Sequence, residues 1–441
     1  MEDKGLSDFK FFSGSIQLID KSVPIDFFAL INQHGEVEFD FDPIVLTNET
    51  SFILKPMSAE QTGLNYFSLF GKSEDGTELR TEDFQINNLV TDSDKSGNHI
   101  RLKGRCSKVI FMRPLVETAL VPTLKMHMKG FQNFHQLVAT CDIGEIVMHG
   151  QNSIVDADTI TGYIAVQAKA SIQPTDLSAW RSDANKLLEH VHKVMSFASA
   201  TLLRVPVIEF YSNKSLEVTA LSQGKQSSAS MRIFHFLNQQ DFFETAVKSF
   251  FNPPFEVKNL FFAVEWFAMD SSYSEVRLAN AMTALENLIA SNLSESETLV
   301  RSKKEFEKVR KNIRCVLKET VKEWFDNEDE RAVALQEINE KMPDLNRKTL
   351  LKKLNIIIKR WSVPMHGIKE SDILAAKKAR DLIVHQGYYD HNRGEELWVH
   401  ITIVREIVVR IILTVLGFKG TYVSHVGGFH DVQFPPVITV N

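Results

Sequence analysis

Two consecutive prolines, Pro253 and Pro254, divide the 441-residue chain into parts with different sequence patterns. Proline lacks a backbone N–H and pushes the residue before it away from helical geometry, so no helix or strand is expected to continue through Asn252-Pro253-Pro254. Short alternating runs dominate before this point, and long runs with helical spacing dominate after it. We therefore predict an α+β multidomain protein, in which a β-rich N-terminal domain with some helices precedes an all-α bundle.

The N-terminal part carries the pattern of short strands. Polar and apolar residues alternate over residues 36–42 and 124–128, and this period of two is typical of a strand with one buried face. Turn residues such as Asp75-Gly76 separate the runs. Residues 1–175 are therefore predicted to form a sandwich or barrel-like β domain.

Residues 176–254 are predicted to form a mixed connecting region. Asp176 is placed to cap a helix over about 179–203, and a hairpin is expected over 205–221. A second helix is expected over 239–251, directly before the two prolines.

Residues 255–441 show the spacing of amphipathic helices. We expect one helix over 257–290, bent near Asp270-Ser271-Ser272, and others over 302–324, 350–361, 371–385 and 395–416. In the helix over 302–324, the residues expected on the inner face are Phe306, Ile313 and either Val316 or Leu317. Long helices with short joins predict a bundle.

Composition excludes several classes of protein. The formal net charge of -6 argues against a protein that coats nucleic acid over its whole surface, although it is compatible with a local basic face. Three charges, Arg405, Glu406 and Arg410, interrupt the apolar run near the end, so no membrane span is predicted. The three cysteines lie far apart, which indicates a reducing, cytoplasmic setting. No phosphate-binding glycine motif and no metal-ligand spacing occurs, so we expect no cofactor and no metal.

One short segment combines residues that could carry chemistry. Arg380 is followed directly by Asp381 and, after four intervening residues, by His385, with Gly387 just beyond. The same R-x(4–6)-H spacing also occurs from Arg360 to His366 and from Arg393 to His400, so spacing alone has little weight. Pro364 interrupts the first of these pairs, and the second begins in a loop. Only Arg380 and His385 share a predicted helix.

This segment resembles the catalytic motif of the HEPN superfamily. Ala284-Leu285-Glu286-Asn287-Leu288 is similar to the opening helix of HEPN domains in ApeA-type anti-phage proteins, and the strand-rich first half is similar to that family in layout. The resemblance implies a metal-independent endoribonuclease that acts in anti-phage defence by abortive infection. It also implies attack of the ribose 2′-hydroxyl on phosphorus, a 2′,3′-cyclic phosphate product and a phage-derived trigger.

In such a reaction His385 is expected to transfer protons, and Arg380 to stabilise the phosphate. Asp381 is expected to orient Arg380, or His385 of a partner chain. Five residues along an ideal helix turn by about 500°, so the two catalytic side chains point about 140° apart. A helix end at Gly387 and a twofold dimer would each help to bring the groups together. We therefore expect a homodimer or a higher even-numbered assembly.

A basic cluster lies next to the motif. Residues 343–380 contain ten Lys or Arg and three Asp or Glu, a net charge of +7 within a chain of -6. Such a concentration attracts a phosphate backbone, although lysines opposite a leucine stripe also fit a solvated helix face. The residues expected to bind RNA are Lys352, Lys353, Lys359, Arg360, Lys377 and Lys378.

A second hypothesis is a non-catalytic HEPN-like module that binds nucleic acid or protein. Arginines and histidines near helix ends are commonly surface or capping residues, and Glu286 fits a solvated or ion-paired position better than a position in a cleft. The intact Arg-polar-x-x-x-His pattern favours the nuclease.

Overall fold

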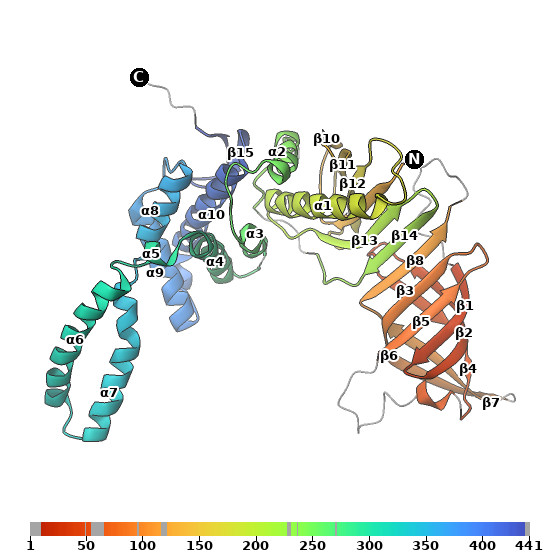
Figure 1. Cartoon of the computed structure of the whole chain (residues 1–441), viewed down its shortest axis with the longest axis horizontal. Coiled ribbons are helices and arrows are strands. Elements are labelled where there is room, and N and C mark those ends of the chain that lie inside the picture. Colours follow the sequence, from red (N-terminus) through yellow and green to blue (C-terminus); the bar gives the residue numbers. More distant parts are fainter. Residues whose placement is uncertain are drawn as a thin grey trace. The chain divides into compact units, whose positions relative to one another are not determined.

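The computed structural model describes residues 10–48, 50–53, 66–94, 97–115, 121–226, 231–235, 237–269 and 271–436 (Figure 1). The chain divides into two compact units, with the boundary between Asn252 and Pro253. The first unit is an antiparallel sheet with two helices, to which Gly420–Val423 also belongs, and the second is mainly helical. The fold is therefore α+β, and the chain changes unit where the proline pair was expected to separate its two parts.

Within the described residues, one antiparallel sheet of fourteen strands forms the first unit, in the order β10-β11-β12-β9-β13-β14-β8-β6-β5-β1-β2-β3. Strand β7 pairs with β6 and β4 beside this path. The strands are β1 (Lys10–Leu18), β2 (Lys21–Ile31), β3 (Val37–Phe41), β4 (Ile44–Val45), β5 (Phe67–Lys72), β6 (Glu78–Asp94), β7 (Gly97–Arg105), β8 (Lys108–Pro114), β9 (Thr123–Lys129), β10 (Leu137–Thr140), β11 (Glu145–Gly150), β12 (Ile160–Gln167), β13 (Arg204–Tyr211) and β14 (Ser215–Leu221).

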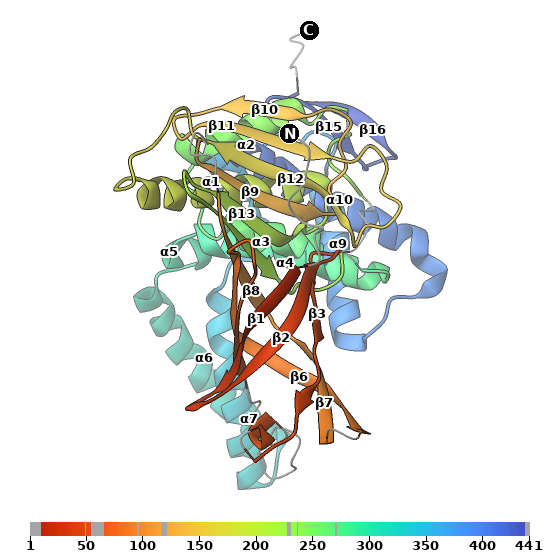
Figure 2. The ribbon, with the colours of Figure 1, turned by 90° about the vertical axis from the view of Figure 1, so that its right-hand side faces the viewer.

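The strands from β8 to β3 form the half of this sheet that curls, which we call the curled half, and phenylalanines fill its interior. Strand β3 contacts β7 without pairing with it, so the strands from β8 to β3 wrap around a common interior (Figure 2). The rings of Phe12 and Phe27 stack at 5.5 Å between centroids, and those of Phe41 and Phe84 meet edge to face at 5.4 Å. All four side chains are buried, and aromatic side chains of this size supply much of the apolar area that stabilises a core.

The region over residues 176–254 was expected to connect two domains, but its residues up to Asn252 are part of the first unit. Strands β13 and β14 lie in the middle of the sheet, between β9 and β8. Helix α1 (Leu177–Ser199) packs on β9 and β12, and α2 (Gln240–Phe251) packs on α1 and β10. The apolar face of α1, which includes Leu187, Leu188 and Val191, is buried.

The polar face of β9 is also buried, and here the half-buried pattern predicted from residues 124–128 is wrong. Glu209 of β13 has no exposed surface, and its carboxylate lies 3.2 Å from Nε2 of His127 and 3.8 Å from Nζ of Lys125. Burial alone would raise the pKa of Glu209, but hydrogen bonds and charges from His127, Lys125 and Tyr211 outweigh it and lower the pKa. Val218 of β14 is the strand partner of Glu209 and belongs to the core of the curled half. The curled half therefore covers the polar face of β9. A buried charge persists there because it has partners.

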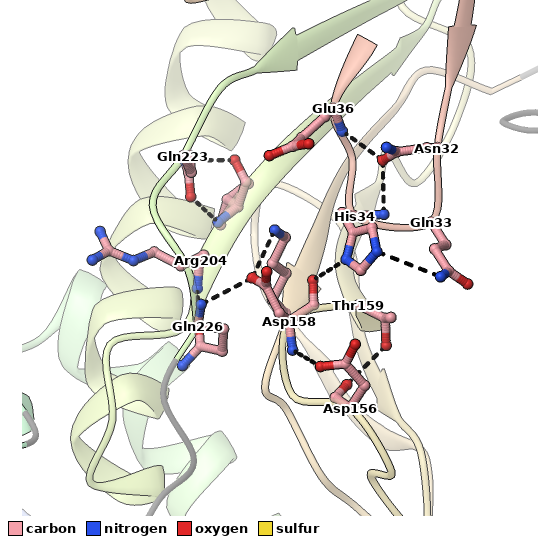
Figure 3. A network of polar contacts seen from close by, with 12 residues as sticks. Asn32, Gln33, His34, Glu36, Asp156, Asp158, Thr159, Arg204, Gln223 and Gln226 are labelled. Carbon is pink, nitrogen blue, oxygen red and sulfur yellow. Dashed lines mark hydrogen bonds and ion pairs between the residues drawn. The ribbon is translucent and has the colours of Figure 1, made fainter. Parts of the chain in front are cut away.

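A second polar network ties distant segments of this unit together (Figure 3). One carboxylate oxygen of Asp158 accepts hydrogen bonds from Nζ of Lys129 at 3.0 Å and from the backbone N–H of Gln226 at 2.9 Å. The backbone carbonyl of Asp158 accepts from Nδ1 of His34 at 3.0 Å. The β2–β3 turn, the segment before β12 and the segment after β14 therefore meet at one residue.

The second unit is built around one buried helix. Helix α10 carries buried residues on every side and packs on α3, α4, α8 and α9. The helices of this unit are α3 (Leu260–Ala268), α4 (Ser274–Asn292), α5 (Glu295–Thr298), α6 (Lys303–Trp324), α7 (Glu328–Lys341), η2 (Met342–Asn346), α8 (Leu350–Trp361), α9 (Glu370–Gln386), η3 (His391–Arg393) and α10 (Gly394–Leu416). Strands β15 (Gly420–Ser424) and β16 (His430–Phe434) form a separate hairpin after α10.

Two expectations about these helices need correction. The helix predicted over 257–290 is two helices, α3 and α4, and of the residues at the predicted bend Asp270 lies outside the described residues. The helix predicted over 302–324 forms as α6, but it packs mainly on α7, a helix that was not predicted. Phe306, Ile313 and Leu317 are half-buried, whereas Val316 is 67% exposed, so the expected inner face does not enter a bundle core.

Two of the charges in the last apolar run form a buried ion pair. Nε of Arg410 lies 2.9 Å from a carboxylate oxygen of Glu406, and Nη1 of Arg410 donates to the backbone carbonyls of His366 and Pro364. The hydroxyl of Ser424 donates to the other oxygen of Glu406 at 3.0 Å.

Among the helices of the described part of the chain, none has the length and apolar character needed to cross a membrane.

We predict that acid weakens the first unit through a histidine of α1. Nε2 of His192 lies 2.7 Å from the carbonyl oxygen of Leu203, which can only accept, and burial lowers the pKa of His192 to about 4. An unfolded chain binds this proton near pH 6.5, so the contribution of His192 to stability is complete above pH 6.5 and is lost as pH falls toward 4. Thermal unfolding of the full chain at pH 7.5 and pH 5.0 should show a lower melting temperature in acid.

The variant His192→Gln keeps an N–H donor for Leu203 but does not titrate, so its melting temperature should depend less on pH. An equal pH dependence in both proteins would show that His192 is not responsible.

Candidate active site

Helix α9 positions both residues of the candidate pair. At its start the carboxylate of Asp372 accepts a hydrogen bond from the backbone N–H of Lys369 at 3.1 Å, and Gly387 ends it in the left-handed region, at φ 81°. The N–H of Gly387 donates to the carbonyl of Ile383 at 2.8 Å, as expected for a glycine cap. Arg380 and His385 therefore lie on one regular helix, with His385 in the last turn.

The guanidinium of Arg380 is held by two carboxylates. Nη2 lies 3.3 Å from Oε2 of Glu286 on α4, and Nη1 lies 3.3 Å from Oδ1 of Asp381. The second oxygen of Asp381 is 2.5 Å from Nζ of Lys377, one turn earlier. The side chain of Arg380 is 27% exposed, so it is oriented by the protein and still reached by solvent.

Asp381 is a carboxylate at the pH of a cell. Partial burial would raise its pKa, but the hydrogen bond and charge of Lys377, followed by those of Arg380, outweigh this effect and lower the pKa. Asp381 contacts Arg380 within the same chain. Glu286, for which a solvated or ion-paired position was expected, is the second acidic partner of Arg380.

His385 lies in a different setting from Arg380. Its imidazole is exposed, and no described residue forms a hydrogen bond or ion pair with it. Because α9 is regular between the two residues, their side chains diverge by about 140°. From this helix geometry we do not expect one copy of the chain to place both side chains on the same phosphate.

The six residues expected to bind RNA have different surroundings. Lys352 and Lys359 on α8 and Lys378 on α9 are exposed, whereas Lys353 is half-buried. Lys377 is paired with Asp381. These residues lie on two helices that contact one another, and Nδ2 of Asn355 on α8 donates to Glu370 on α9 at 3.1 Å.

Arg360, the sixth of these residues, has a role inside the fold. Its guanidinium donates to the carboxylate of Glu297 and to the backbone carbonyl of Asn292. Hydrogen bonds from Ser294, followed by that from Arg360, lower the pKa of Glu297 to about 2. Arg360 therefore fastens α8 to the end of α4 and to α5, and it is not free to bind phosphate in this conformation.

The other two matches to the motif spacing do not share a helix. Arg360 lies in α8, which ends at Trp361, so His366 falls in the following loop. Arg393 lies in η3 and pairs with Glu396, and His400 follows in α10. Within the described part of the chain, no group of three or more His, Cys, Asp or Glu side chains is placed to hold a metal ion.

We predict that Arg360→Gln raises the pKa of Glu297, because the variant keeps an N–H donor but loses the positive charge. The remaining hydrogen bonds from Ser294 should keep the pKa below the ordinary value of 4.5. NMR titration of the side-chain carboxyl carbon measures this change, with Arg347→Gln as a control because Arg347 pairs with Asp344 instead. A pKa of Glu297 that stays at about 2 in Arg360→Gln would contradict the assignment.

Comparison of this chain with protein-family models, with curated proteins and with solved structures gives no match.

Proposed function

We propose that this protein is a metal-independent endoribonuclease of the HEPN type that acts in anti-phage defence by abortive infection. The observation that carries the proposal is the arrangement on α9, which holds an oriented arginine, Arg380, and ends one residue after a solvent-exposed histidine, His385. A basic residue with no competing contact and an oriented cation are the two parts that RNA cleavage without a metal requires. A histidine sealed in an apolar core would have removed the support for this reaction.

The reaction is an internal transfer at phosphorus. The 2′-oxygen bonds to phosphorus while the bond from phosphorus to the 5′-oxygen breaks. The imidazole of His385 accepts the proton of the 2′-hydroxyl, and a protonated imidazole supplies a proton to the departing 5′-oxygen. The products are a 2′,3′-cyclic phosphate and a 5′-hydroxyl, and neither water nor a metal ion is consumed.

Arg380 stabilises the negative charge that develops on the phosphate oxygens. A guanidinium has five N–H donors, and the contacts with Glu286 and Asp381 use one donor on each of two nitrogens. The remaining donors can bind phosphate while the two carboxylates keep the guanidinium oriented. Donors that are oriented before the reaction need no reorganisation in the transition state.

A dimer would bring an arginine and a histidine together although Arg380 and His385 of one copy diverge. A twofold axis near the end of α9 would place the histidine of one copy beside the arginine of the other. The exposed cations Lys352, Lys359 and Lys378 would then extend the positive surface along the RNA. We leave Arg360 out of this surface because of its contacts with Glu297 and Asn292.

We expect His385→Ala and Arg380→Ala each to reduce RNA cleavage by about 10²- to 10³-fold, because each variant removes one catalytic group. Induced expression in a bacterial host, followed by sequencing of RNA ends that carry a cyclic phosphate, measures this effect. His366→Ala and Arg393→Ala are matched controls, since both residues belong to the decoy pairs, and they should cleave like the wild type.

Equal cleavage by the wild type and His385→Ala would reject the assignment of His385. If the wild type produces no new RNA ends even during phage infection, the non-catalytic binding module becomes the better explanation.

We also expect Glu286→Gln to lower the turnover rate by about 10-fold, or roughly 1.4 kcal/mol of activation free energy, with little change in KM. The amide keeps the shape of the side chain but no longer fixes the guanidinium through charge. Glu286→Asp should retain more activity than Glu286→Gln. Faster cleavage by Glu286→Gln would show instead that this carboxylate competes with the phosphate for Arg380.

A further inference from the structure

Helices α6 and α7 form an arm, residues 303–341, that is separate from the helical core of the second unit (Figure 1). Every residue of both helices is described, and Val321 is the single buried one. The two helices hold each other through half-buried apolar residues and through a hydrogen bond from Nε of Arg314 to Oδ1 of Asn339 at 2.8 Å. With 22 residues, α6 is about 33 Å long.

An arm with so little buried surface is poorly stabilised by its own contacts. Helices in water depend mainly on packing of an apolar face, and a pair of helices buries little area. Yet α6 exposes 48% of Val309, 67% of Val316 and 62% of Trp324. These residues are seven and eight positions apart, so they lie within one stripe along the helix. Helix α7 therefore covers only part of the apolar stripe of α6.

The charge of the arm is balanced in sum but divided along its length. The tip, residues 319–331, contains six acidic and two basic residues, a net charge of -4. The stem, residues 303–318 and 332–341, contains eight basic and four acidic residues, a net charge of +4. The arm therefore has an acidic tip, a basic stem and no net charge.

We propose that the arm binds the arm of a second copy of this chain, with the two arms antiparallel and related by a twofold axis. In this arrangement the acidic tip of each arm lies on the basic stem of the other, and both contacts form at once because the interface is isologous. Trp324 at one tip then covers the exposed valines of the opposite stem. This contact is separate from the pairing of motifs proposed above and does not depend on the nuclease activity.

The charge division favours a second copy over RNA as the occupant. A phosphate backbone would be attracted to the stem but repelled by the tip, which lies on the same pair of helices. A second arm provides opposite charge for both the acidic tip and the basic stem. Self-complementary charge of this kind specifies a partner identical to the chain itself.

The test is the mass of the full chain in solution, measured by light scattering at micromolar concentration. The stem variant combines Lys304→Glu, Lys308→Glu and Lys311→Glu, and the tip variant combines Glu323→Lys, Asp326→Lys and Glu330→Lys. Each variant alone should have half the mass of the wild type, because like charges then face each other. An equimolar mixture of the two should regain the wild-type mass, since every contact again joins opposite charges.

A control variant, Lys103→Glu with Lys169→Glu and Lys225→Glu, makes the same change of charge on exposed lysines of the first unit and should keep the wild-type mass. Circular dichroism should show equal helix content in all variants. A stem variant that keeps the wild-type mass, or a mixture that does not reassemble, overturns the proposal. Loss of affinity for a labelled single-stranded RNA without a change in mass would overturn it in favour of an RNA-binding arm.

Discussion

The helical unit depends on the burial of α10 between Ile401 and Leu416. In this stretch the apolar residues are buried on every side of the helix, and its two buried charges, Glu406 and Arg410, have partners that neutralise them. Removing one partner of a buried pair costs roughly 3–5 kcal/mol, because the other charge is then stranded. Arg410 also binds the carbonyls of Pro364 and His366, which lie in the loop that joins α8 to α9. The pair therefore helps to fix where α9 begins.

The position of α9 in turn determines the surroundings of the candidate pair. Its buried residues Ile373, Ala376 and Ala379 face the core, which leaves Arg380 beside α4 and within reach of Glu286. His385 lies five residues later, on another side of the helix and past the last buried residue. The same helix therefore provides one side chain that is oriented by the protein and one that is open to solvent. This division of roles is what the proposed chemistry requires.

Charge is used differently in the two units. In the sheet, Glu209 and Asp158 lie in or beside the core and join segments that are far apart in sequence. In the arm of α6 and α7, most charges are exposed, and in our proposal their distribution along the arm selects a second copy of the chain. The interior charges favour one way of folding the chain, whereas the exposed charges of the arm are proposed to select its partner.

Several features were determined by the sequence alone. Local signals act over a few residues, so Pro253-Pro254 marked the change of unit, Gly387 marked the end of α9, and helical spacing located α1, α8, α9 and α10. The same local logic excluded two of the three motif matches, because a helix end lies between their members.

Tertiary structure alone decided what covers each face and which distant groups meet. The alternation in β9 could not reveal that the curled half of the sheet buries its polar side, because burial depends on strands far away in sequence. Nothing local distinguished Arg360, which binds Glu297, from the exposed lysines around it. The apolar stripe on α6 predicted a helix with one covered face. It did not predict that α7 is the helix that covers this face, because an amphipathic pattern does not identify the partner. The sequence therefore indicated many of the elements and several of their ends, and packing decided which elements meet.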